Sequence, residues 1–218
     1  RVDHELLRAE MNGFDFYVRV LQPWVRDPAF YQSVWNDQSD TPAHEGSEHH
    51  GIVEVWTYEF PLSKAAEAKL TGELAIVPPL LKQAEGNLTG NARDLWVTGA
   101  GSMRKQLDSL DALAKRTAGG GRALQQAIRA AREATVKFCD WLDAQAPSKT
   151  GPSGIGKDNY SWSLQNVHLV PMTWEEEVDL LKRELARSHA SLKLEEARNA
   201  GLPELPMIGN NEEFQRRA

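Results

Sequence analysis

The densest group of chemically capable side chains lies at residues 44–50, where five of the seven residues are histidine or glutamate. His and Glu are the usual zinc ligands of sites that contain no cysteine. Zinc peptidases of the His-Glu-x-x-His type need two histidines four residues apart on one helix face. Here Glu48 stands four places after His44, and His49 follows one place later. A nearby proline and glycine disfavour a helix, so we expect an exposed polar loop near 37–51 with His44, Glu48 and His49 as candidate metal ligands.

A second pattern, Gly151 to Lys157, has the Gly-x-x-x-x-Gly-Lys spacing of a phosphate-binding loop. That motif needs Ser or Thr after the lysine and a strand before the loop. Asp158 follows the lysine here, and a Pro/Gly/Ser-rich loop at 146–156 precedes it. The spacing alone therefore does not predict a nucleotide site.

Four hydrogen-bonding or aromatic residues follow that loop at the start of a predicted short helix. Side chains at such loop–helix junctions often line ligand clefts, which combine apolar walls with a few polar groups. Cleft lining and simple packing account equally well for this group. The candidate substrate-binding residues are Lys157, Asn159, Tyr160 and Trp162.

The elements that must position these residues are helical. Apolar residues recur with the period of a helix along most of the chain, which predicts an all-α array of about six helices with long loops. The glycines at 119–121 mark a break, and the run Ile52–Phe60 is strand-like but has no evident partner strand. The predicted helical segments are 2–21, 63–77 with a shorter piece to 87, 92–115, 124–142, a short helix from 157, and 174–201.

Local signals mark several helix boundaries. Pro23 should end or bend the first helix, and Ser63 is a plausible N-cap. Thr173 with Glu176 predicts a capping box, followed by an apolar stripe on the last helix. The third helix should be weakened around Gly99–Gly101. The stripe of the last helix consists of Trp174, Val178, Leu181, Leu185 and Leu192.

Composition excludes several classes of protein. The 218 residues are 41% hydrophobic and carry a net charge of −6. This charge argues against nonspecific electrostatic binding to nucleic acid or to an anionic membrane. The single cysteine, Cys139, excludes an internal disulfide framework. No apolar run approaches the roughly 20 residues of a membrane span. We expect a soluble protein in which residues 1–218 form one helical region, with cytoplasm and export both open as locations.

Long stretches of the chain resemble bacterial proteins of the domain-of-unknown-function 885 family. The resemblance covers nearly the whole chain. That family is large and helical and is grouped with zinc metallopeptidases of the gluzincin kind, so the resemblance implies part of a larger metallopeptidase-like fold, a peptide-like substrate, and zinc in the full-length protein. The residues that carry it are Arg26–Tyr31, Asp40–Gly46, Asn87–Trp96, Pro147–Tyr160, and Asn166–Pro171 running into Thr173–Val178.

The family's metal motif, a His-Glu pair followed by Pro-Gly-His, comes in the later half of much longer proteins and is absent here. The tract at His44 echoes it but is one residue short, so neither zinc ligation nor a catalytic role is transferred to any residue. The resemblance therefore implies an N-terminal scaffold and substrate-cleft wall that is inactive alone, has the missing C-terminal half as its partner, and uses Tyr160 as a substrate contact.

Two other functions stay open. The chain could be a self-contained helical module that binds a protein or peptide, or a metal-binding helical protein that uses His44, Glu48, His49 and His50. A severed half should leave a contiguous apolar face of more than a few hundred Å², whereas a complete module should not. The metal-binding alternative requires two or three of the loop side chains to converge on one point.

Overall fold

The computed structural model describes residues 2–35, 51–203 and 207–217, and it confirms the all-α fold. Strands β1 (Val34–Trp35) and β2 (Val53–Glu54) pair in parallel over two residues, which corrects the expectation that the run Ile52–Phe60 has no partner. The chain divides into two compact units, with the boundary between Asn159 and Tyr160.

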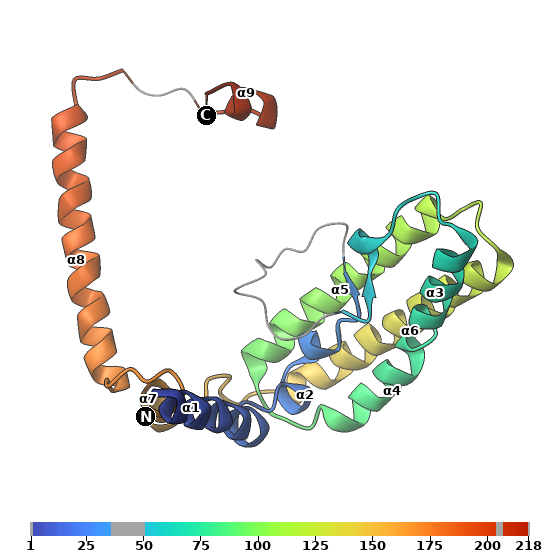
Figure 1. Ribbon diagram of the computed structural model, residues 1–218, viewed down its shortest axis with the longest axis horizontal. Coiled ribbons are helices and arrows are strands. Elements are labelled where there is room, and N and C mark those ends of the chain that lie inside the picture. The colour runs from blue at the N-terminus through green and yellow to red at the C-terminus, as the bar shows by residue number, and fades with distance from the viewer. Residues whose placement is uncertain (1, 36–50, 204–206, 218) are drawn as a thin grey trace. The chain divides into compact units, whose positions relative to one another are not determined.

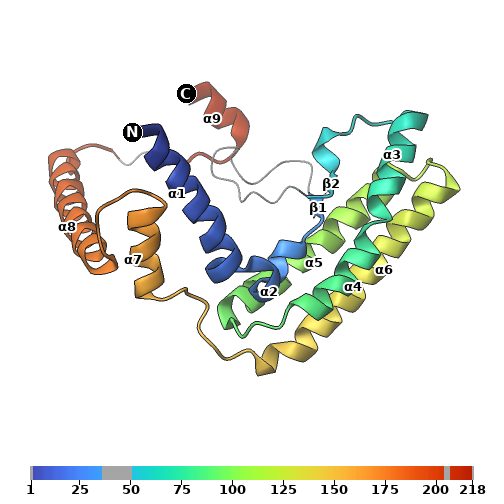
Figure 2. The same cartoon turned by 60° about the horizontal axis from the view of Figure 1, so that its bottom comes forward.

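Four helices form the body of the first unit. Helices α5 (Arg93–Arg116) and α6 (Arg122–Gln145) lie side by side, and α3 (Lys64–Leu74) and α4 (Val77–Asn87) pack along α6 (Figures 1 and 2). The three glycines at 119–121 lie in the connection between α5 and α6. Helix α5 runs without a break through Gly99–Gly101, so the expected weakening is absent.

The core lies between these helices. Every residue of the periodic pattern predicted for 124–142 is buried on α6, where it meets apolar side chains of α3, α4 and α5. Full burial of one large aliphatic or aromatic side chain contributes about 1.5–3 kcal/mol. The buried α6 residues predicted from the sequence are Leu124, Ile128, Ala131, Thr135, Phe138 and Leu142.

A buried amide joins β1 to this core. The side-chain oxygen of Gln106, on α5, accepts hydrogen bonds from the backbone N–H groups of Ser33 at 2.7 Å and Val34 at 3.0 Å. Its amide nitrogen donates to Thr135 Oγ1 on α6 at 3.0 Å. One side chain thus gives hydrogen-bond partners to buried polar groups of the β1 segment and of α6.

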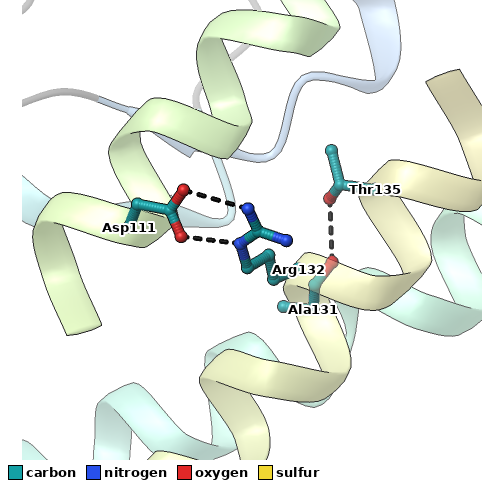
Figure 3. Close-up of polar contacts among 4 residues, drawn as sticks. All are labelled: Asp111, Ala131, Arg132 and Thr135. Atoms are coloured by element: carbon teal, nitrogen blue, oxygen red, sulfur yellow. Dashed lines mark hydrogen bonds and ion pairs between the residues drawn. The ribbon is translucent and has the colours of Figure 1, made fainter.

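An exposed ion pair also links α5 to α6 (Figure 3). Arg132 Nε donates to Asp111 Oδ1 at 2.6 Å, and Arg132 Nη2 donates to Oδ2 at 3.1 Å. These hydrogen bonds lower the pKa of Asp111, so their stabilising effect is present above the ordinary pKa and is lost as the pH falls through the lowered one. Both side chains are 44% exposed, so solvent screening weakens the pair.

The N-terminal segment changes geometry where the sequence predicts. Helix α1 (Val2–Phe16) continues as a π-helical turn at Tyr17–Leu21 and ends at Gln22, whose φ is 41°. Pro23 then opens the short helix α2 (Pro23–Arg26) at its first position, where a missing N–H costs nothing. Asp27 caps the 3-10 turn that follows at Pro28–Tyr31.

Helices α7 (Lys157–Asn166), α8 (Trp174–Asn199) and α9 (Asn211–Arg217) follow, and the unit boundary falls within α7. The capping box of α8 is confirmed, since Thr173 Oγ1 accepts from Glu176 N–H and the Glu176 carboxylate accepts from Thr173 N–H. The stripe behind it does not form a packed face, because α8 has no buried residue. None of the helices in the described part of the chain combines the length and apolarity needed to cross a membrane.

Candidate functional site

The first unit contains a cleft of about 450 Å³ that is built from three segments far apart in the sequence. One wall comes from residues 17–32, one from Leu95 at the start of α5, and one from Ser153 and Ile155 in the loop before α7. The polar groups of the cleft include Arg26, Asp27 and Ser153. Its apolar surface includes Leu21, Phe30, Leu95 and Ile155.

The loop wall is fixed because it caps α5. Ser153 Oγ accepts hydrogen bonds from the N–H groups of Asp94 at 2.7 Å and Leu95 at 3.3 Å, and the Gly151 carbonyl accepts from Arg93 N–H at 3.1 Å. The residue at the ordinary N-cap position, Ala92, has no side chain that could do this. The loop therefore supplies the acceptors that the first turn of every α-helix needs.

Asn91 holds the other end of the same loop. Its side-chain oxygen accepts from Thr150 N–H at 2.6 Å and from Gly151 N–H at 3.0 Å. A Cβ at residue 151 would lie 2.2 Å from the carbonyl oxygen of Asn91, so only glycine allows this approach.

Lys149 adds a cation beneath the loop. Its Nζ donates to the Gly90 carbonyl at 2.8 Å and lies 4.2 Å from the centre of the buried Trp96 ring. Burial lowers the pKa of this ammonium group. Because its contacts face backbone and ring rather than the cleft, we assign Lys149 to loop anchoring.

Arg26 projects into the cleft from the last turn of α2. Its Nη2 donates to the carbonyl oxygens of Ser153 at 2.8 Å and Gly154 at 3.3 Å. The stem of the side chain passes Gly90, where a Cβ would come within 3.0 Å of Arg26 Cγ. The guanidinium is thus held by the backbone carbonyls of Ser153 and Gly154, and the stem of the side chain lies against Gly90.

Asp27 shapes the floor of the cleft. Its Oδ1 accepts from Ala29 N–H at 2.8 Å and so fixes the 3-10 turn that carries Phe30. This turn packs directly on Gly99 of α5, where a Cβ would lie 2.7 Å from the backbone nitrogen of Ala29. Gly99 is therefore a close-contact position between α5 and the cleft.

The four candidate substrate-binding residues predicted from the sequence lie near the cleft in sequence but are not among its lining residues. Lys157 and Asn159 are exposed at the start of α7, where Asn159 Nδ2 donates to the Ile155 carbonyl at 2.8 Å. Tyr160 and Trp162 belong to the second unit and are 36% and 39% exposed. A hydrogen bond with the Glu177 carboxylate is the main cause of the raised pKa of Tyr160.

The predicted metal ligands cannot be placed in this architecture. His44, Glu48, His49 and His50 lie outside the described residues. Within ranges 2–35, 51–203 and 207–217, no three His, Cys, Asp or Glu side chains are grouped so that they could hold a metal ion. The described residues therefore do not fit a zinc site, and we derive no metal-dependent step from them.

The sequence did not single out Arg26, Asp27, Phe30 or Leu95 as site residues, although each lies in a segment on which the expectation of an 885-family protein rests. Only their convergence in space makes them a site, and periodicity does not report that convergence. No family model, curated protein or solved structure matches the chain. The cleft is therefore interpreted from its own chemistry.

Proposed function

We propose that the first unit is the helical scaffold and substrate-cleft wall of a zinc-dependent, peptidase-like hydrolase whose metal motif lies in further protein chain. One observation carries this proposal. Three of the segments on which the resemblance to the 885 family rests meet around a single cleft, namely Arg26–Tyr31, Asn87–Trp96, and the loop part of Pro147–Tyr160.

The cleft residues supply binding and orientation in this proposal. Arg26 offers a fixed hydrogen-bond donor, and Leu21, Phe30 and Ile155 offer apolar surface beside it. Fixing a substrate by a few rigid groups lowers the entropic part of a reaction barrier. In hydrolases of this kind the zinc ion polarises the scissile carbonyl and activates water.

Exposed apolar side chains outside the cleft support the proposal that this chain is part of a larger protein. On α1, Leu6, Met11 and Phe14 are 56–64% exposed, and on α8 the side chains of Leu181 and Leu185 are 57–59% exposed. Stripes of this kind are typical of surfaces that pack against other protein. A self-contained module would be expected to bury them.

A peptide-binding module without catalysis is the second candidate. The cleft itself favours it, because a single cation among apolar walls can bind a peptide without any metal. The metal-binding alternative rests on His44–His50 and has no support from the described residues.

Zinc content and peptidase activity, measured on this 218-residue chain and on a form extended by the sequence encoded downstream, test the proposal. We expect stoichiometric zinc and peptide cleavage only in the extended form. In that form, Arg26→Gln should raise KM while leaving the zinc content unchanged, because Arg26 binds substrate and not metal.

Stoichiometric zinc in the 218-residue chain would contradict the proposal if it were lost on changing His44 and His49 to Ala. That outcome would place a metal site in the loop near 37–51 instead. An extended form that binds peptides but never cleaves them, with or without zinc, would favour the binding module.

A further inference from the structure

We propose that the cleft recognises the C-terminal residue of a peptide, with Arg26 binding its carboxylate and the apolar walls holding an apolar side chain. This inference deepens the proposed function and rests on it only in treating the bound peptide as a substrate. The binding itself needs neither metal nor catalysis.

In the described part of the chain, the Arg26 guanidinium is bonded to neutral groups. Both of its hydrogen bonds run from Nη2 to neutral carbonyl oxygens, those of Ser153 and Gly154. Among the described residues it forms no ion pair with a carboxylate, and its Nε and Nη1 donors have no partner. A guanidinium held in this way keeps its Nε and Nη1 donors for charge-assisted hydrogen bonds, and a carboxylate oxygen can accept such a bond from either nitrogen.

The remaining charge in the cleft favours a monovalent anion. Asp27 is the carboxylate among the lining residues, and its Oδ1 is engaged with Ala29 N–H. A dianionic phosphate would face one cation and one carboxylate, whereas a single carboxylate matches the one guanidinium. Charge complementarity therefore favours a carboxylate as the occupant.

The apolar lining argues for the terminal residue of a peptide. A C-terminal residue carries its carboxylate and its side chain on the same carbon atom, so both must be accommodated within one small site. Leu21, Phe30, Leu95 and Ile155 line the same cleft as Arg26, and its volume of about 450 Å³ lies within the usual range for small-molecule sites.

Calorimetric titration of the 218-residue chain with matched peptides tests this inference. The probes are N-acetyl-Ala-Ala-Phe as the acid, the same peptide as its C-terminal amide, and N-acetyl-Ala-Glu-Phe-amide, which carries an internal carboxylate. We expect the acid to bind roughly tenfold or more tightly than either amide, as one charge-assisted hydrogen bond to the carboxylate implies. Arg26→Gln should abolish this preference and leave the affinity for the amides unchanged.

Arg129→Gln is the matched control, because Arg129 is exposed on α6 and does not line the cleft. Thermal unfolding shows whether Arg26→Gln is folded, and the acid–amide comparison on the unaltered chain needs no variant at all. Equal affinity for acid and amide would overturn the inference, and so would a full preference retained by Arg26→Gln.

Two further results would also overturn it. If the internal-glutamate peptide bound as tightly as the acid, the cleft would not be specific for the C-terminal residue. Tighter binding of inorganic phosphate, with displacement of the peptide, would make the cleft a phosphate site. These outcomes would not affect the zinc and activity test of the proposed function. Failure of every peptide to bind would also contradict the proposal that this unit forms the wall of a substrate cleft.

Discussion

Tyr160 keeps its phenolic proton to a higher pH than an ordinary tyrosine. The main cause is its hydrogen bond with the Glu177 carboxylate, to which burial and the charge of Glu177 add. A neutral phenol has one hydrogen to donate, and here the Glu177 carboxylate accepts it, so the Tyr160 oxygen is left as an acceptor.

We predict that Glu177→Gln lowers the pKa of Tyr160 toward the ordinary value of about 10, because it removes the negative charge that opposes ionisation. Titration of the tyrosine carbon resonances by NMR measures the shift at each of the four tyrosines. Glu196→Gln, an exposed position on the same helix, should leave the pKa unchanged. An unaltered Tyr160 pKa in Glu177→Gln would show that the hydrogen bond does not control it.

Gln106 shows why single side chains were the hardest part to predict. Its position on a helix could be read from the period of α5, but its hydrogen-bond partner Ser33 lies 73 residues away in the sequence. Arg26 is a similar case, since its partner Ser153 is 127 residues distant. Sequence patterns report neighbours within one element, and both of these contacts join different elements.

At the scale of elements, local signals predicted well. The α6 stripe is buried and the capping box of α8 is formed, because both depend on residues within a few positions of each other. The stripe on α8 obeyed the same rule but is exposed, so periodicity indicated an amphipathic helix without indicating what covers it. The convergence of three segments around the cleft left no periodic signal.

Two glycines two residues apart on α5 give a matched test of the contact beneath the cleft. We predict that Gly99→Ala destabilises the first unit by about 1–3 kcal/mol, because its Cβ would meet Ala29, Pro28 and Asp27 within 2.8 Å. Gly101→Ala should be neutral or stabilising by up to about 1 kcal/mol, since no described atom lies within 4 Å of its Cβ and alanine favours the helix.

Urea unfolding followed by circular dichroism measures both glycine variants. Gly99→Ala should also weaken peptide binding, because the 3-10 turn that carries Phe30 must move away from α5. Equal stability of the two variants would show that α5 and this turn are not in close contact.

At the scale of the whole molecule, the two units differ in what stabilises them. In the first unit, α5 and α6 share a buried core. Helix α8 has no buried residue, and it is stabilised by its capping box, by exposed ion pairs such as Arg187–Glu184, and by contacts of its first turn with α7. Isolated helices of this kind are only marginally stable in water, because local hydrogen bonds alone barely offset the free-energy cost of helix nucleation.

We predict that the backbone amides of α8 exchange with solvent much faster than those of α6 in the 218-residue chain. Hydrogen–deuterium exchange with mass spectrometry compares the two helices within one sample, so α6 serves as the internal control. Equal protection of α8 and α6 would show that the exposed leucines are covered in solution, and a dependence on protein concentration would identify a second copy as the cover.

The cap on α5 has a consequence for how the protein is made. Ser153 lies 59 residues after Asp94, whose N–H it accepts, so a ribosome releases all of α5 before the acceptor for its first turn exists. Until then those amides must bond to water, and the wall that Ser153 and Ile155 contribute is missing. The cleft is therefore complete only after the α5–α6 core has been synthesised.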